Sequence, residues 1–181
     1  MAKLKQPERC AYLSKIAAQI ASDAHVLDQP WSVYRSELAA ENAFFRENLL
    51  SEHINLLLSS MSSLQKRMPT AEGVKPEQFI EWRSGSSQAQ WLAQWDGMNL
   101  ALQAVLQRLR DDGASPIANK VQQDIAQVNK NCRNLPTHLA QSSASARLAC
   151  SKSVATLKAI IEDQIGEQFD LTLGFTEGDG D

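Results

Sequence analysis

The chain has 181 residues, of which 43% are hydrophobic and 22% are charged, and its formal net charge is −3. These values are close to those of ordinary globular proteins, so they exclude a chain that is disordered throughout. A chain of this length can form one domain and bury a core without help from a metal or a disulfide.

Two features predict a cytoplasmic protein. The N-terminus reads Met-Ala-Lys-Leu-Lys-Gln-Pro-Glu, with charges where a signal peptide needs an apolar stretch, and the longest aliphatic run is residues 56–58. The cysteines are an odd set without a C-x-x-C pair, which fits a reducing compartment and excludes the usual zinc spacings. We therefore expect small core residues at Cys10, Cys132 and Cys150.

Hydrophobic periodicity predicts an all-α fold, a helical bundle of five or six helices. The first helix is expected over residues 7–28, stopped by Pro30, and the second over residues 32–68. Residues 69–76 form a polar loop, and a short helix follows over residues 77–83. Further helices are predicted over residues 86–112, 116–135 and 137–165.

The helices over residues 32–68 and 86–112 are expected to form the centre of the bundle. Both have bulky apolar residues that step by four and three, as bundle-facing positions do. Trp91 and Trp95 lie on this pattern, so a core position is favoured over stacking on nucleic-acid bases. The first helix has its own apolar stripe, which includes Leu13.

In the last residues of the chain the hydrophobic pattern changes its period. From Phe169 to Phe175 apolar residues alternate with others, which is a strand or extended pattern, and residues 161–181 contain seven acidic residues and no basic one. We therefore predict a helical domain over residues 1–166 and an extended acidic tail over residues 167–181. An all-helical body offers the tail no sheet, so the tail either straps onto the helices or binds a partner.

Residues 168–173, Gln-Phe-Asp-Leu-Thr-Leu, resemble the short motif by which bacterial polymerases and replication or repair factors bind the sliding clamp. The resemblance implies that Gln168 hydrogen-bonds in one pocket of the clamp. It implies that Leu171 and Leu173 fill an apolar pocket and that Phe169, where leucine is commoner, takes a tolerant position. The helical body is more faintly similar to small primosome-restart proteins and accessory proteins of mobile elements.

A basic stretch suggests a second partner. Residues 114–160 contain six basic residues and one acidic residue. Arg147 and Lys158 are eleven residues apart, which returns to nearly the same helix face, and Lys130 and Arg133 are one turn apart. If these charges gather on one surface, they give a weak, salt-sensitive DNA contact, and otherwise they are a solvated surface.

No motif for catalysis, a cofactor or a metal is found, because the histidines lack H-E-x-x-H spacing and no phosphate loop or G-x-S-x-G occurs. We therefore predict a non-enzymatic accessory protein of DNA replication, repair or mobile-element maintenance that binds the sliding clamp. The alternative is a structural or regulatory helical adaptor, homo-oligomeric or chaperone-like, whose tail straps its own bundle. An enzyme is the third possibility.

Overall fold

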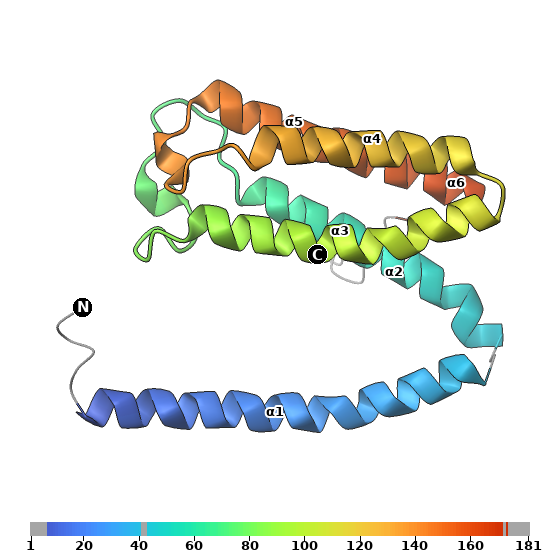
Figure 1. Ribbon diagram of the computed structural model, residues 1–181, viewed down its shortest axis with the longest axis horizontal. Helices are drawn as coiled ribbons and strands as arrows, with labels where there is room; N and C mark the ends of the chain where they lie inside the picture. Colours follow the sequence, from blue (N-terminus) through green and yellow to red (C-terminus); the bar gives the residue numbers. More distant parts are fainter. Residues whose placement is uncertain (1–6, 41–42, 172, 174–181) are drawn as a thin grey trace, which may run out of the picture. The chain divides into compact units, whose positions relative to one another are not determined.

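The structure, a computed structural model, describes residues 7–40, 43–171 and 173 (Figure 1). These residues form helices joined by turns and loops, with no strand among them, so the predicted all-α fold is confirmed. Contacts divide the chain into two units, residues 1–50 and residues 51–181, which are described separately. The predicted boundary at residue 166 divides the chain in another way and stays a prediction.

Helix α1 runs from Pro7 to Ala39 and contains Pro30, so the expected stop at this proline is wrong. A proline inside a helix removes one backbone N–H donor, but the turns on either side keep theirs. The helix ends at Ala39, and helix α2 begins at Ala43 rather than near residue 32. None of the described helices is long and apolar enough to cross a membrane.

The apolar stripe of α1 is exposed. The exposed fraction of its side chains ranges from 39% for Ile16 to 63% for Ile20, and Trp31 is 59% exposed. Trp31 packs edge-on against Tyr34, with 5.5 Å between the ring centres. Helix α1 therefore carries the predicted apolar stripe, but the side chains of this stripe are exposed rather than buried.

From residue 51 on, the chain forms an antiparallel bundle of four helices (Figure 1). After α2, which ends at Lys66, the bundle continues with α3 (Ser87–Asp111), α4 (Ser115–Cys132) and α5 (Ala144–Ile160). Gly113 has a φ of +79°, the left-handed conformation that glycine favours after a helix, and Pro116 occupies the first turn of α4.

The core of the bundle contains the predicted stripes. The Trp91 indole N–H donates to the carbonyl of Leu64 (3.0 Å), and that of Trp95 donates to Asn129 Oδ1 (2.9 Å), which satisfies both buried rings. The expected core positions of both tryptophans are therefore confirmed. The buried stripe of α2 is Ile54, Leu57, Met61 and Leu64, which buried Met68 continues just after the helix, and that of α3 is Trp91, Trp95, Met98, Leu102, Val105 and Leu109.

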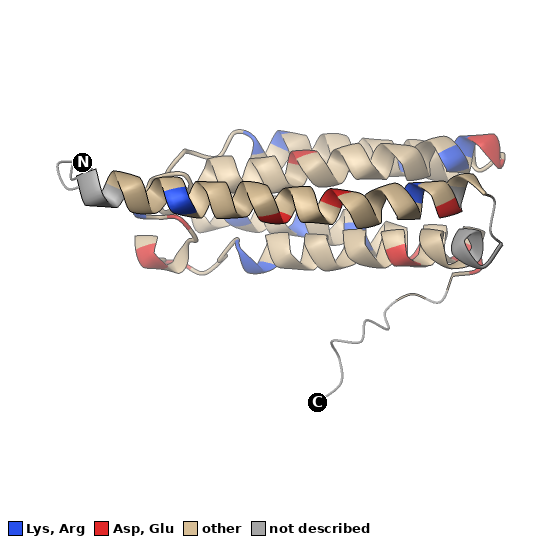
Figure 2. Ribbon diagram, turned by 90° about the horizontal axis from the view of Figure 1, so that it is seen from below, with Lys and Arg blue, Asp and Glu red and all other residues tan. Residues whose placement is uncertain are grey.

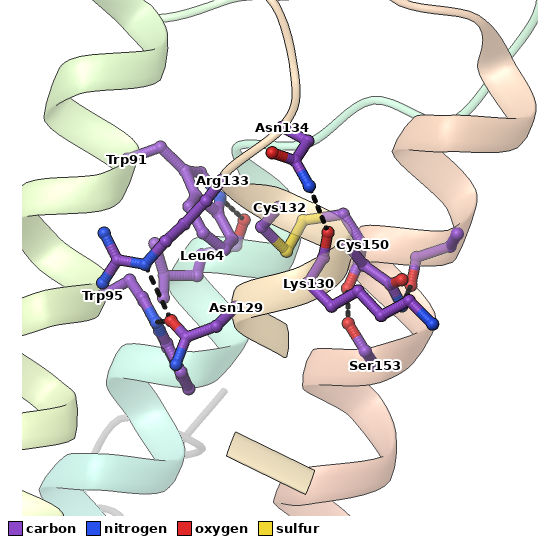
Figure 3. The surroundings of a disulfide bond; sticks show 12 residues. Leu64, Trp91, Trp95, Asn129, Lys130, Cys132, Arg133, Asn134, Cys150 and Ser153 are labelled. Carbon is purple, nitrogen blue, oxygen red and sulfur yellow. Dashed lines mark hydrogen bonds between the residues drawn. A yellow bond between two sulfur atoms is a disulfide. The ribbon is translucent and has the colours of Figure 1, made fainter. Parts of the chain in front are cut away.

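Cys132 and Cys150 form a disulfide that joins the end of α4 to α5 (Figure 3). Their Cα atoms are 5.0 Å apart, although the residues are 18 positions apart in sequence. Cys132 and Cys150 are buried, so their predicted core position is confirmed, but the expectation that they are reduced thiols is wrong. The core position expected for Cys10 is also wrong, because this residue is exposed. Antiparallel packing of two helices brought the pair together, and no local spacing could predict it.

The predicted helix over residues 137–165 is interrupted at both ends. A 3-10 turn over Leu139–Gln141 comes first, and α5 begins after Ser143, whose hydroxyl oxygen accepts from the backbone N–H of Ala146 (3.2 Å). After α5 the chain makes a π turn over Ile161–Ile165 and a short helix α6 over Gly166–Gln168.

Candidate binding cleft

An apolar cleft lies where the α2–α3 loop meets the α4–α5 loop. One wall comes from the first loop with the start of α3 and the other from the second loop, and the open space between them has a volume of about 180 Å³. A 3-10 turn over Pro76–Gln78 replaces the short helix that was expected over residues 77–83. The cleft is lined by Pro76, Phe79, Trp82, Ser87, His138, Leu139, Ala140 and Gln141.

The first wall is anchored by Phe79, which is buried, while Trp82 is half-buried. Between them, Glu81 has a φ of +57°, a left-handed conformation that is uncommon for a residue other than glycine. The Arg83 guanidinium lies 5.1 Å from the centre of the Trp82 ring, within the range of a cation–π contact. The strained turn therefore places an aromatic ring and a positive charge beside the cleft.

His138 of the second wall packs against Gly85 of the first loop, and this glycine has a φ of +69°. A Cβ atom at this position would lie 2.9 Å from Cε1 of His138, closer than side chains approach one another. Only glycine combines the left-handed conformation with this close approach. The imidazole of His138 is therefore held over the backbone that leads into α3.

Arg147 ties the two loops together. It is 2% exposed, and its Nε donates to the carbonyl of Pro69 (2.7 Å) while Nη2 donates to that of Ala71 (2.6 Å). Its Nη1 donates to the carbonyl of Ser142 in the second loop. Arginine suits this role because its five N–H donors lie in a fixed plane. Arg147 was predicted to lie at a surface, and the structure instead buries it as a link between the walls.

Replacing Arg147 by methionine should lower the free energy of unfolding by on the order of 3 kcal/mol, because buried carbonyl groups lose their donors. Urea denaturation followed by circular dichroism measures this change. The control is Lys152→Met, which removes an exposed cation from the same helix. Equal stability of the two variants would show that the link contributes nothing.

The other three predicted nucleic-acid contacts do not form a basic surface with Arg147. Lys130 is exposed, Arg133 is paired with Asp96, and Lys158 lies 3.3 Å from Glu162. Figure 2 shows acidic and basic residues interspersed along the helices. In Figure 3, Arg133 points toward Asn129, whose Oδ1 it approaches at 2.9 Å. The charges of Arg133 and Lys158 therefore form ion pairs within the bundle.

The C-terminal segment folds back on the end of the bundle. The backbone N–H of Leu171 donates to the carbonyl of Gly166 (2.9 Å), and Leu173 packs so closely that a Cβ on this glycine would lie 2.9 Å from its Cδ1. Gln168 is exposed and Phe169 is half-buried. The expected strand rhythm gives no strand in the described part, and residues 172 and 174–181 lie outside the described residues.

The cleft contains a serine and a histidine, which raises the question of nucleophilic chemistry. The Ser87 hydroxyl donates to the carbonyl of Ile80 at 2.5 Å, so its proton is directed away from His138. A base that activates a serine has to accept this hydrogen bond. Among the described residues, no group of three or more His, Cys, Asp or Glu residues could hold a metal ion.

A family model described as imelysin, with the label peptidase M75, matches residues 2–165. The chain belongs to the imelysin family. No curated protein and no solved structure matches it. The imelysin match contains α1, the four-helix bundle and both walls of the cleft, and it ends just before the short helix α6.

Membership of the imelysin family overturns the assignments made from the C-terminal motif and the helical body. The likeness to sliding-clamp-binding proteins and to primosome-restart or mobile-element proteins is wrong, as is the role in DNA replication with a DNA-binding surface. A six-residue pattern carries little information, and here two of its residues, Leu171 and Leu173, contact Gly166.

Sequence reasoning missed the cleft, although one signal was present. Trp82 and Arg83 precede Ser84-Gly85, a turn sequence directly before a helix. His138 lies more than fifty positions further on in the sequence, so only packing of the two loops brings it to the same place.

Proposed function

We propose that this imelysin-family chain is a non-catalytic binding protein of an oxidising compartment, and that its cleft holds one ring-sized apolar group of a ligand. The observation that carries the proposal is the aromatic cleft between two loops that Arg147 links by three hydrogen bonds to backbone carbonyls. Binding sites combine an apolar lining with a few placed polar groups, and here Trp82 and His138 can supply both.

The size of the cleft supports a ring-sized ligand group. Its volume is about 180 Å³, and an apolar cavity of roughly 150 Å³ is known to accept benzene. The phenyl ring of Phe79 and the indole of Trp82 favour offset or edge-on contact with another ring. Walls that are fixed before binding also lower the entropic cost of ordering them around a ligand.

The disulfide supports the proposal that the protein works in an oxidising compartment. Disulfides persist in oxidising environments and are rare in the cytosol, where thiols are kept reduced. The link between Cys132 and Cys150 is buried and joins two core helices, so it belongs to the folded bundle. We therefore propose an oxidising compartment in place of the cytoplasm that the number of cysteines had suggested.

A direct test titrates 15N-labelled protein with benzyl alcohol, a soluble single-ring probe, and follows the Gly85 amide and the Trp82 indole N–H by NMR. We expect saturable shifts at both positions, with a Kd of about 1 mM for so small a probe. Ala140→Trp fills the cleft and should abolish these shifts. Leu148→Trp, at a residue of α5 that is 40% exposed, is the matched control.

Shifts that are the same in the Ala140→Trp variant and the control would place the probe outside the cleft and end the proposal. The non-catalytic part has its own test, because the family model carries a peptidase label. We expect no cleavage of unfolded casein by the purified chain. Cleavage that disappears in a Ser87→Ala variant would instead show that the cleft is an active site.

A further inference from the structure

The cleft between the two loops has an apolar floor and a polar rim. Phe79 and Leu139, which line it, are each 3% exposed, whereas His138 and Gln141 are exposed and Trp82 is half-buried. No Asp, Glu, Lys or Arg lines the cleft itself. A ligand that inserts an apolar ring therefore keeps its polar part at the rim, beside these three side chains.

The rim offers hydrogen-bond donors. The indole N–H of Trp82 can only donate, and it has no acceptor among the described residues, unlike the two buried indoles of α3. The imidazole of His138 and the amide of Gln141 can also donate, and neither side chain forms a hydrogen bond within the described part of the chain. These groups suit a ligand that presents hydrogen-bond acceptors at the rim.

A positive charge lies beside the rim. The guanidinium carbon of Arg83 is 5.1 Å from the centre of the Trp82 ring. Arg83 is exposed and forms no ion pair with a described residue, whereas Arg108 and Arg133 each pair with an aspartate. A guanidinium that stacks on a ring keeps its N–H donors for a second partner, and their planar arrangement fits a carboxylate. The charge of Arg83 is therefore available to a ligand that binds against Trp82.

The carboxylates of the same loop do not pair with this charge. Glu81 lines a separate, smaller hollow, to which Arg67 also belongs. Glu77 is exposed and lies two positions from the exposed Lys75, which carries the opposite charge. Neither glutamate lines the cleft. The rim therefore has a cation beside it whose charge is not neutralised by an ion pair among the described residues.

We propose that the ligand of the cleft is an aromatic carboxylate, with its ring on the apolar floor and its carboxylate at the rim, facing Arg83 and the indole N–H of Trp82. This inference rests on the proposed binding function of the cleft and adds the chemical class of the ligand. Aromatic rings in contact have centres about 4.5–7 Å apart, so the ligand ring and the guanidinium are neighbours of the same indole. A carboxylate attached directly to the ring is then within reach of Arg83, whereas an ammonium group there meets a like charge.

Three probes with the same ring test the charge: benzoate, neutral benzyl alcohol and benzylammonium. Each is titrated at neutral pH into the full 15N-labelled chain with its disulfide intact, and the Trp82 indole N–H and the Gly85 amide report binding. We expect benzoate to bind roughly three- to tenfold more tightly than benzyl alcohol, and benzylammonium to bind more weakly than either. Sodium chloride at about 0.5 M should reduce the advantage of benzoate, because salt screens an exposed ion pair.

Arg83→Gln removes the charge and should bring the ratio of the benzyl alcohol Kd to the benzoate Kd down to about one. The matched control is Arg110→Gln, which changes an exposed arginine in the last turn of α3, roughly 35 Å along the helix from the cleft. This control should keep the wild-type ratio.

The outcomes separate this inference from the binding function of the cleft. If benzyl alcohol binds and benzoate binds no more tightly, or if Arg83→Gln and Arg110→Gln give the same ratio, the carboxylate is wrong and the cleft remains a site for a ring. If neither probe shifts the Trp82 and Gly85 signals, the carboxylate and the binding function of the cleft are both wrong.

Discussion

Replacing Leu102 by alanine should lower the free energy of unfolding by about 2–5 kcal/mol. Leu102 is fully buried in the middle of α3, and truncation removes methyl groups from a packed core and leaves a cavity. Leu57→Ala should give a loss in the same range, because Leu57 is 3% exposed on the facing stripe of α2. Urea denaturation followed by circular dichroism gives both values.

The matched control is Leu148→Ala, which makes the same chemical change at a side chain that is 40% exposed on α5. Its effect should be no more than about 1 kcal/mol, because water already contacts much of this side chain. Equal losses in Leu102→Ala and Leu148→Ala would show that the stripes of α2 and α3 are not the centre of the bundle.

Removing the disulfide should cost about 3 kcal/mol of stability, the value for a closed loop of this length. The variant is Cys132→Ala with Cys150→Ala, and its midpoint temperature of thermal unfolding should be lower by roughly 6–12 °C for a domain of this size. Part of the effect comes from the unfolded chain, which loses a constraint between residues 18 positions apart.

Two measurements separate this effect from a packing defect. Reductant added to the wild-type chain should produce the same loss, while Cys10→Ser should not change the stability, because Cys10 is exposed in α1. A thiol titration of the denatured, unreduced protein should find one reactive cysteine. Three reactive thiols in protein taken from an oxidising compartment would contradict both the disulfide and the proposed location.

Much of the bundle could be predicted because helical periodicity is a local property. The expected helix over residues 86–112 matches α3 within one residue at either end, and the one over residues 116–135 matches α4 at its start. The apolar stripe predicted for residues 86–112 is the buried one. The boundary at Pro30 failed because the cost of one lost hydrogen bond does not decide where a long helix ends.

The functional assignment failed for a related reason. A short run of residues such as 168–173 can match a motif by chance, and its fit to a partner depends on whether its backbone is accessible. The family was found by a match over residues 2–165, where many positions contribute. The length of the match, rather than any single motif, identifies an imelysin.

Only the tertiary structure decided which cysteines pair, where Arg147 points and what lies beside Trp82. Each of these depends on residues from separate elements, brought together by helix packing and by the two loops at one end of the bundle. Arg147 shows the physical reason most clearly. Its charge predicted a place in water, but carbonyl groups of both loops offer its guanidinium enough acceptors to be buried.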